Sequence, residues 1–479
     1  MRKIREEQTI DQIFYLTQWQ YDALDRVVKM TYPDNLEITY EYNSQDKIER
    51  IPNYLLNVDY NALGQIIKKD YANGLSTQIS YYEDDLRPQR IFTSGLQDLN
   101  FIYDELGRVT AISDAIDAEH QSFQYDDLSR LAMAEGPYGT SNYVYDSLGN
   151  IIQKGNLHYF YESDKPHAVT RIEDKDGVEV MRFAYDENGN MVKMEQREAG
   201  SNPVKFTATQ YGYDVENYLT EVRRNGFRLA AYEYDEDGSR IKKAVFKLIH
   251  TPHQFEEGAQ LASLPHPRLI PQVTRYVGKL YEEQKTRKTS YIFLDSQRMA
   301  SVTSAEGVRL PAVGQGSTSG GNGKTLYYSG DHLQSTNILT DEQGTIKELC
   351  KYEPWGQFSK RKTYGDDDEI ASFYFTDKLL DEESDLYYFG YRYYNPALGR
   401  FLMVDPREAV ELTDKDIPEA SREHTINDIA KLYIKEALFN VDASPFNLHN
   451  PQDLNKYSYV DNNPINWVDP LGLFKFIVH

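Results

Sequence analysis

The sequence predicts an all-β protein in which short hairpins follow one another and pair into one long, curved β-sheet. The first observation is a motif, clearest where residues 103–107 read Tyr-Asp-Glu-Leu-Gly, that recurs at 145–149 and 185–189. Weaker copies of the motif begin at Tyr21, Tyr60, Tyr125, Tyr213 and Tyr234. A period of about 21 residues is typical of an array of small supersecondary units. The other observations are strand-like alternation before each motif and a content of 39 tyrosines.

Each copy of the motif predicts one hairpin. Residues 99–103 alternate as a half-buried strand does. Asp104 can then accept backbone N–H groups two residues further on and start a turn, and Gly107 accepts a positive φ. A return strand begins at Val109. Because one hairpin is marginally stable in water, we expect neighbouring hairpins to pair into a continuous sheet.

The composition excludes several classes of function. The net charge of −23 over 479 residues argues against nucleic acid or an anionic membrane as a partner, since both require clustered Lys and Arg. Cys350 is the single cysteine, so no intrachain disulfide is possible. No apolar run reaches the roughly 18 residues of a membrane span, and residues 1–7 lack the apolar stretch of a classical signal peptide.

Residues 1–245 are predicted to form the repeat array, and residues 246–325 to add further strands with a proline-rich loop and a Gly/Ser-rich loop. The proline-rich loop contains His250, His253 and His266, but their spacing matches no tight zinc motif. The glycines near residue 320 lack the spacing of a phosphate-binding loop. The sequence therefore predicts no metal and no cofactor.

The phrases after residue 325 are more specific. Residues 327–336 read Tyr-Tyr-Ser-Gly-Asp-His-Leu-Gln-Ser-Thr, residues 385–396 read Asp-Leu-Tyr-Tyr-Phe-Gly-Tyr-Arg-Tyr-Tyr-Asn-Pro, and residues 469–473 read Asp-Pro-Leu-Gly-Leu. In this order they resemble the core of the Rhs (rearrangement hotspot) proteins. The preceding array is similar to the YD repeats of Rhs toxins, toxin-complex C components, wall-associated contact-inhibition proteins and, more distantly, teneurins.

This resemblance covers nearly the whole chain and assigns residues 326–406 to the Rhs-associated core and residues 453–479 to its end. Residues 407–452 are predicted to be a helical insertion, because Thr425 and Asp428 fit a capping box and are followed by apolar residues at helical spacing. The resemblance implies a strip of sheet that spirals around a hollow interior as a partial shell, with the core segment plugging one end.

The function that the resemblance implies is a scaffold that encloses and delivers a C-terminal toxin or effector. Its expected partners are that effector and, in addition, secretion or shell proteins. Its expected location is secreted or at the cell surface by a non-classical route. After Leu473 only six residues remain, so we expect the effector to be missing from this sequence. The alternative is a cell-surface adhesion protein whose tyrosine rings stack on glycans.

The resemblance also implies self-cleavage after the Asp-Pro-x-Gly-Leu motif, here between Leu473 and Phe474. The residues assigned to this reaction map by motif onto Asp405, Asp469 and Arg400. Two carboxylates held close do not readily both ionise, so one can act as a base towards water and the other as an acid towards the peptide.

Two features depart from the family pattern at this site. Asp405 and Asp469 stand 64 positions apart, and residues 405–408 read Asp-Pro-Arg-Glu without the usual glycine. Both Asp-Pro pairs also fit simple type I turns with no catalytic role. The structural and the catalytic interpretation both remain open from the sequence.

Overall fold

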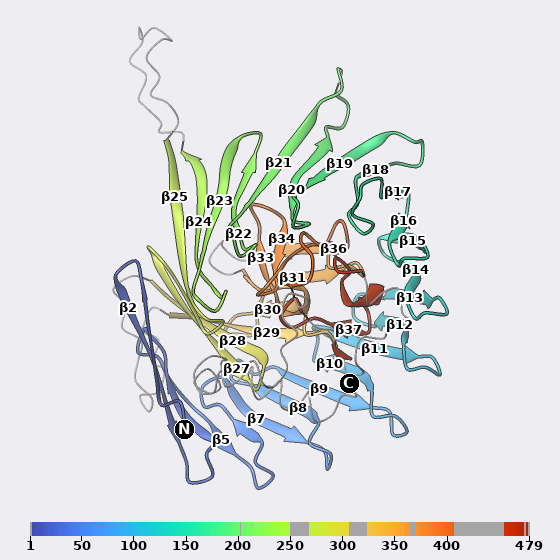
Figure 1. The fold of residues 1–479 in the computed structure, drawn as a ribbon. Coiled ribbons are helices and arrows are strands. Elements are labelled where there is room, and N and C mark those ends of the chain that lie inside the picture. Colours follow the sequence, from blue (N-terminus) through green and yellow to red (C-terminus); the bar gives the residue numbers. More distant parts are fainter. Residues whose placement is uncertain are drawn as a thin grey trace, which may run out of the picture.

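The computed structural model describes residues 2–201, 203–249, 268–305, 323–364, 370–406, 455–473 and 476–477. Strands make up 56% of the structure and helices 2%, which confirms the all-β prediction (Figure 1). The predicted helical insertion, most of the proline-rich and Gly/Ser-rich loops, and Phe474 lie outside the described residues. Within the described ranges, no helix is both long and apolar enough to cross a membrane.

The first strands form two small sheets: β1 (Arg5–Ile10), β2 (Ile13–Tyr21), β3 (Val27–Thr31) and β4 (Glu37–Thr39), then β5 (Glu41–Tyr42) and β6 (Ile48–Arg50). The large sheet begins with β7 (Leu55–Tyr60), β8 (Ile66–Tyr71), β9 (Ser76–Tyr81), β10 (Pro88–Thr93), β11 (Gln97–Tyr103), β12 (Val109–Asp114), β13 (Glu119–Tyr125), β14 (Leu131–Gly136), β15 (Gly139–Tyr145), β16 (Ile151–Lys154), β17 (Leu157–Phe160), β18 (Arg171–Glu173) and β19 (Glu179–Tyr185). It continues with β20 (Met191–Arg197), β21 (Phe206–Tyr213), β22 (Leu219–Arg224), β23 (Phe227–Tyr234), β24 (Arg240–Ile249), β25 (Arg268–Val277), β26 (Tyr281–Gln284), β27 (Arg287–Leu294), β28 (Gln297–Ala305), β29 (Gly323–Gly330), β30 (Thr336–Thr340), β31 (Ile346–Tyr352) and β32 (Phe358–Thr363).

The remaining elements are short: the 3₁₀ turn η2 (Phe375–Asp377), the strands β33 (Leu379–Asp381), β34 (Leu386–Tyr388), β35 (Tyr393–Asn395) and β36 (Arg400–Phe401), the 3₁₀ turn η5 (Val460–Asn462), and the strands β37 (Trp467–Val468) and β38 (Phe476–Ile477). We call the hairpins of residues 2–364 the wall, and residues 370–406 with 455–473 the plug.

The large sheet of the wall contains 26 strands, β7 to β32, and each pairs antiparallel with the next along the chain. No ladder of backbone pairs between the described residues joins β32 to β7, so the sheet is open. It curves around the plug, which lies in its middle (Figure 1). This arrangement confirms the predicted strip of spiralling hairpins.

The turn of each hairpin is built as the motif predicts. Asp104 donates its N–H to the carbonyl of Arg108 at 2.9 Å, and Gly107 donates to the carbonyl of Asp104 at 2.9 Å. The Asp104 carboxylate accepts the N–H groups of Leu106 and Arg108 at 3.0 and 2.9 Å. Gly107 adopts φ +77°, a region that glycine enters without a steric penalty. The turn is therefore specified by residues that are four positions apart.

The motif tyrosines link each hairpin to the one before it. The Tyr125 hydroxyl donates to the carbonyl of Val109 at 2.6 Å, and the Arg108 guanidinium lies 4.8 Å from the Tyr125 ring centre. The same hydroxyl-to-carbonyl bond recurs at Tyr21, Tyr42, Tyr60, Tyr81, Tyr103, Tyr145, Tyr161, Tyr213, Tyr234 and Tyr352. Eleven of the 39 tyrosines are thus used for contacts between neighbouring hairpins of the wall.

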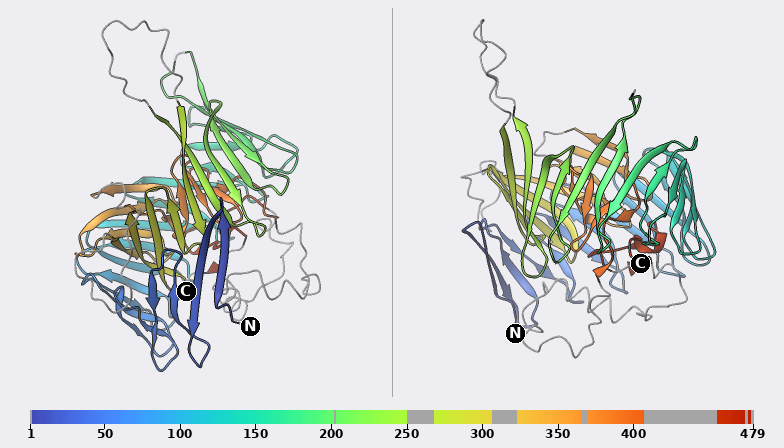
Figure 2. Two further views of the ribbon diagram at one scale, coloured as in Figure 1. Left: turned by 90° about the vertical axis from the view of Figure 1, so that its left-hand side faces the viewer. Right: turned by 45° about the horizontal axis from the view of Figure 1, so that its top comes forward.

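The two ends of the large sheet meet through side chains instead of a strand ladder. The Tyr71 hydroxyl donates to the carbonyl of Tyr328 at 3.4 Å, and the Asn73 amide donates to the Thr340 hydroxyl at 3.0 Å. Figure 2 shows the early hairpins, in blue, beside the late ones, in yellow and orange. These contacts bring the first and the last hairpins of the strip against each other.

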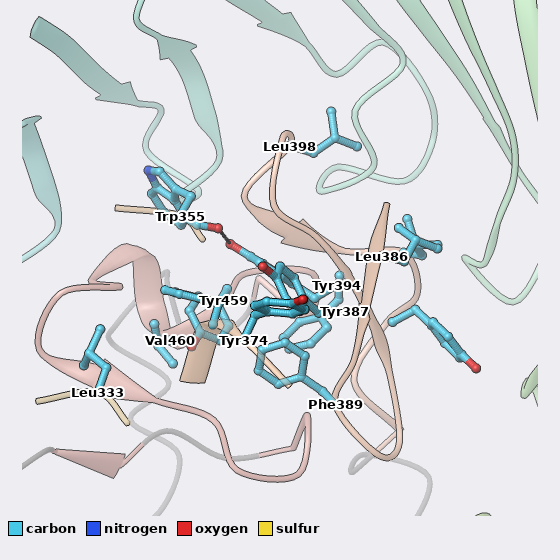
Figure 3. Packing of buried hydrophobic residues seen from close by; sticks show 14 of the residues in the cluster. Leu333, Trp355, Tyr374, Leu386, Tyr387, Phe389, Tyr394, Leu398, Tyr459 and Val460 are labelled. Carbon is cyan, nitrogen blue, oxygen red and sulfur yellow. Dashed lines mark hydrogen bonds between the residues drawn. The ribbon is translucent and has the colours of Figure 1, made fainter. Parts of the chain in front are cut away.

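The plug packs by aromatic side chains. Tyr394 lies 4.7 Å from Tyr459 between ring centres, and Phe389 lies 5.5 Å from Phe401. The Tyr394 hydroxyl donates to the carbonyl of Trp355, a residue of the wall, at 2.9 Å (Figure 3). The rings belong to one buried cluster that includes residues of wall strands from β10 to β31. Plug and wall therefore share a hydrophobic core.

A buried charge cluster also joins plug and wall. Arg240, on β24, contacts the carboxylate of Asp381, on β33, at 2.5 Å, and neither side chain is exposed. Lys243 contacts the same carboxylate at 2.8 Å. Burial raises the pKa of Asp381, but the charges of Arg240 and Lys243 outweigh it and hold that pKa below its usual value.

Candidate active site

Backbone pairs of the plug join residues that precede the 407–454 segment to residues that follow it. Before it, Arg400 forms an isolated antiparallel bridge with Ser458, and Phe401 donates its N–H to the carbonyl of Tyr457 at 3.0 Å. Asp405 then donates its N–H to the carbonyl of Lys456 at 3.1 Å. These pairs fix Asp405 against the part of the plug that leads to Asp469.

Asp469 organises the turn formed by residues 469–473, which we call the cleavage turn. Its carboxylate accepts the N–H of Leu471 at 3.3 Å and the N–H of Leu473 at 2.9 Å. Gly472 completes the turn at φ +75°. These side-chain bonds reverse the chain over residues 470–473 and bring the Leu473 amide back to the Asp469 carboxylate.

Arg392 brings the two aspartates together. Its Nη2 lies 3.2 Å from Oδ2 of Asp405 and 3.4 Å from Oδ2 of Asp469. Its Nη1 donates to the carbonyl of Lys456 at 3.0 Å, and its Nε donates to the carbonyl of Gly472. The side chains of Arg392 and Asp469 are 3% and 4% exposed and that of Asp405 is 12% exposed, so the three groups meet where bulk solvent is largely excluded.

Arg400, which the resemblance assigned to this site, lies elsewhere. Its guanidinium donates to the hydroxyl of Tyr161 at 3.3 Å and to the carbonyl of His167, both in the wall. The structure places Arg392 with Asp405 and Asp469 and places Arg400 at the contact between plug and wall. Arg392 and Arg400 are the two arginines between residues 370 and 406. Both arginines stand in the phrase that carries the resemblance, and no signal in the sequence separates them.

A lysine adds to the positive charge beside Asp469. Burial lowers the pKa of Lys378 to about 8, while the charges of Asp377 and Asp469 act to raise it. The Lys378 ammonium donates to the carbonyl of Thr376 at 3.0 Å and lies 5.2 Å from the ring centre of Phe389. The electrostatic influence of Lys378 therefore reaches the cleavage turn.

The chain after the cleavage turn returns to the strand that precedes it. Trp467 pairs with Ile477, and Val468 pairs with Phe476, in the antiparallel ladder of β37 and β38. Leu473 is described and its neighbour Phe474 is not, so the expected cleavage bond lies at the edge of the described residues. Nowhere in the described ranges do three or more His, Cys, Asp or Glu side chains gather as a metal site requires.

This arrangement has the parts of an acid–base site for peptide hydrolysis. Two carboxylates share one guanidinium nitrogen, and one of them holds the amide of Leu473. A carboxylate pair of this kind can divide the roles of base and acid between its members. The arginine offsets part of their mutual repulsion and fixes their orientation.

Comparisons with known proteins agree with this fold. No protein-family model matches the chain. It is 25% identical over 365 residues to the "tRNA3(Ser)-specific nuclease WapA" of Bacillus spizizenii, covering 74% of this chain and 12% of that protein. It is also 25% identical over 338 residues to "Toxin protein Tse5" of Pseudomonas aeruginosa, covering 64% of this chain and 24% of that protein. The chain thus spans less than a quarter of the length of these relatives.

Solved structures of toxin complexes share the fold. The crystal structure of TcdB2-TccC3 aligns with a TM-score of 0.59 at 18% identity, covering 96% of this chain and 22% of that one. The Photorhabdus luminescens Tc holotoxin pore aligns with a TM-score of 0.60 at 18% identity, covering 97% of this chain and 21% of that one. The recurring Tyr-Asp hairpins, the plug and these relatives confirm the resemblance of the chain to the Rhs/YD-repeat proteins.

Proposed function

We propose that the chain is the plugged part of an Rhs-type shell, which encloses and delivers a C-terminal toxin or effector. Support comes from the curved wall around the plug and from relatives that are named as toxins and nucleases. The toxin-complex structures, in which TccC3 occurs with TcdB2, support a second shell protein as a partner. The motif tyrosines contact neighbouring hairpins within the wall, and no observation favours the glycan-binding alternative.

The proposal includes self-cleavage of the bond between Leu473 and Phe474. The observation that carries it is the position of the Asp405 and Asp469 carboxylates, 3.2 and 3.4 Å from one nitrogen of Arg392. This proximity holds although 64 positions separate the two aspartates, because the plug pairs across the intervening segment.

In the proposed reaction, one carboxylate removes a proton from a water molecule, and the water oxygen attacks the carbonyl carbon of Leu473. The other, protonated carboxyl group gives its proton to the nitrogen of Phe474 as the C–N bond breaks. The products are a carboxylate on Leu473 and an amine on Phe474. Arg392 holds the two carboxylates in place and is a positioning residue.

Intact-mass measurement of the purified protein tests this reaction. We expect the wild-type protein to yield a species that ends at Leu473, and we expect Asp405→Asn and Asp469→Asn to remain uncut. Arg392→Gln should slow cleavage by roughly 10²-fold or more, the scale seen when a preorganised charge is removed from an active site. Arg400→Gln is the matched control, because it removes a buried arginine of the plug that touches neither aspartate.

Cleavage of Asp469→Asn at the wild-type rate would refute the carboxylate mechanism. A wild-type protein that remains uncut at every pH at which it stays folded would refute self-cleavage and leave the shell to be tested separately. Co-purification with a shell protein supplied in the same cells tests the delivery role.

A further inference from the structure

A tight turn of the plug faces the cleavage turn with its backbone. Residues 389–392 form this turn, in which Phe389 donates its N–H to the carbonyl of Arg392 at 2.9 Å; we call it the cradle. The N–H of Tyr391 donates to the carbonyl of Leu471 at 3.1 Å. The Nε of Arg392 donates to the next carbonyl, that of Gly472. Two consecutive carbonyls before the expected cleavage bond are therefore bound by consecutive residues of the cradle.

The two turns approach so closely that a glycine is needed on each side. Gly390 adopts φ +99°, and a Cβ built there would lie 3.3 Å from the carbonyl oxygen of Leu471. Gly472 adopts φ +75°, and a Cβ built there would lie 3.2 Å from both the Arg392 nitrogen and the Phe389 Cβ. Contacts of 3.2–3.3 Å are tighter than ordinary van der Waals contacts, so a Cβ on either glycine would push the two turns apart by a few tenths of an ångström. The cradle thus selects a turn that carries glycine at this position.

Arg392 belongs to the cradle and to the carboxylate pair at once. The same guanidinium binds the Gly472 carbonyl, Asp405 and Asp469. Since Asp469 is itself the first residue of the cleavage turn, its carboxylate reaches Asp405 only when that turn lies in the cradle. Binding of the peptide segment and assembly of the site are therefore one event.

We propose that residues 389–392 are the peptide-recognition element of this site: they dock an Asp-Pro-x-Gly turn through its backbone and thereby complete the carboxylate pair. The catalytic part rests on the self-cleavage proposed above, whereas the docking part does not. Cleavage is then confined to a segment that carries its own aspartate. A peptide that lacks this aspartate or the glycine leaves the site incomplete.

Amide hydrogen exchange of the full chain tests the docking directly. Measured in an Asp405→Asn background, which keeps the chain uncut, Gly390→Ala should speed exchange at the Tyr391 and Leu473 amides at least about tenfold, the scale of one lost hydrogen bond. Gly177→Ala is the matched control, because Gly177 adopts φ +74° with no atom within 4 Å of its added Cβ. The control should leave both amides unchanged.

Gly472→Ala places the same clash on the cleavage turn, and it reports on docking even if Gly390→Ala fails to fold. Exchange at Tyr391 that stays at the level of the parent protein in Gly472→Ala would overturn the proposal. In a chain that keeps Asp405, Gly390→Ala and Gly472→Ala should each lower the cleavage rate by about the factor by which they raise the amide exchange rate. The pH dependence of cleavage should stay unchanged. If no protein cleaves but exchange responds as expected, self-cleavage fails and the cradle stands.

Discussion

The polar contacts within the wall differ in kind from the polar contact that joins the wall to the plug. In the wall, Asp104 and Arg108 pair within four residues, and their side chains keep 23% and 19% of their surface exposed. At the plug, Arg240 and Asp381 pair across 141 residues, and both are fully buried. The wall therefore repeats a polar contact that is local and weak, while the polar contact between plug and wall joins residues distant in the chain and is costly to leave unpaired.

The largest expected effect comes from breaking the buried ion pair between plug and wall. Arg240→Met leaves the buried Asp381 with Lys243 as its cationic partner, so the expected cost is about 3 kcal/mol, the lower end of the range for a broken buried pair. Arg108→Met, the equivalent change in the wall, should cost about 1 kcal/mol or less. Urea unfolding followed by tyrosine fluorescence measures both. Equal losses in the two variants would contradict the distinction between wall and plug.

A smaller effect should separate two tyrosines of the same motif. Tyr103→Phe removes one hydrogen bond, to the carbonyl of Pro88 at 2.9 Å, and should cost about 1 kcal/mol. Tyr125→Phe removes the bond to Val109 and also the acceptor of the Asn466 amide, which reaches it from the plug at 2.9 Å. We expect roughly twice the loss, about 2 kcal/mol. Urea unfolding measures both variants. A loss of stability in Tyr125→Phe no greater than that in Tyr103→Phe would show that the hydrogen bond from the plug adds no stability at Tyr125.

The smallest expected effect is a change in pH dependence. His332 contacts the carbonyl of Ile465, in the plug, at 2.9 Å, and burial lowers its pKa below the ordinary value of 6.5, against the opposing charge of Asp331. As the pH falls through 6.5, the unfolded chain binds a proton at His332 that the folded chain does not, so stability decreases.

Replacing this histidine should flatten the pH dependence. His332→Gln keeps an amide donor for Ile465, and the slope of unfolding free energy between pH 7.5 and about pH 5.5, above the carboxylate range, should become shallower than in the wild type. His120→Gln, an exposed histidine of the wall, is the control and should keep the wild-type slope. A steeper slope in His332→Gln would show that the buried imidazole is charged in the folded protein.

The sequence was sufficient to predict the wall because each turn is specified locally. Asp104, Gly107 and Arg108 make their contacts with one another, so the motif contains the information that forms the hairpin. The hydroxyl of Tyr125 reaches only one hairpin back. A period that repeats such contacts then predicts the sheet, and the observed order of strands agrees with it.

The candidate site could be predicted only in part. The motifs identified Asp405 and Asp469, and the turn at Asp469 follows from its own four residues. Choosing between Arg392 and Arg400 required the path of the plug, since both arginines stand near the same phrase. The Arg392 guanidinium lies 3.2 Å from the Asp405 carboxylate, whereas the Arg400 guanidinium lies 3.3 Å from the Tyr161 hydroxyl. No local pattern encodes that difference.

The pairing of Asp405 with Lys456 allows the length of the segment between them to vary. Backbone bonds clamp the two sides of the 407–454 segment within the same small region. The entropy of closing a longer excursion grows only slowly with its length. Residues added or removed between these clamps therefore need not disturb the aspartates, which makes this position a permissive entry point for new sequence during evolution and for inserted tags or binding modules in engineering.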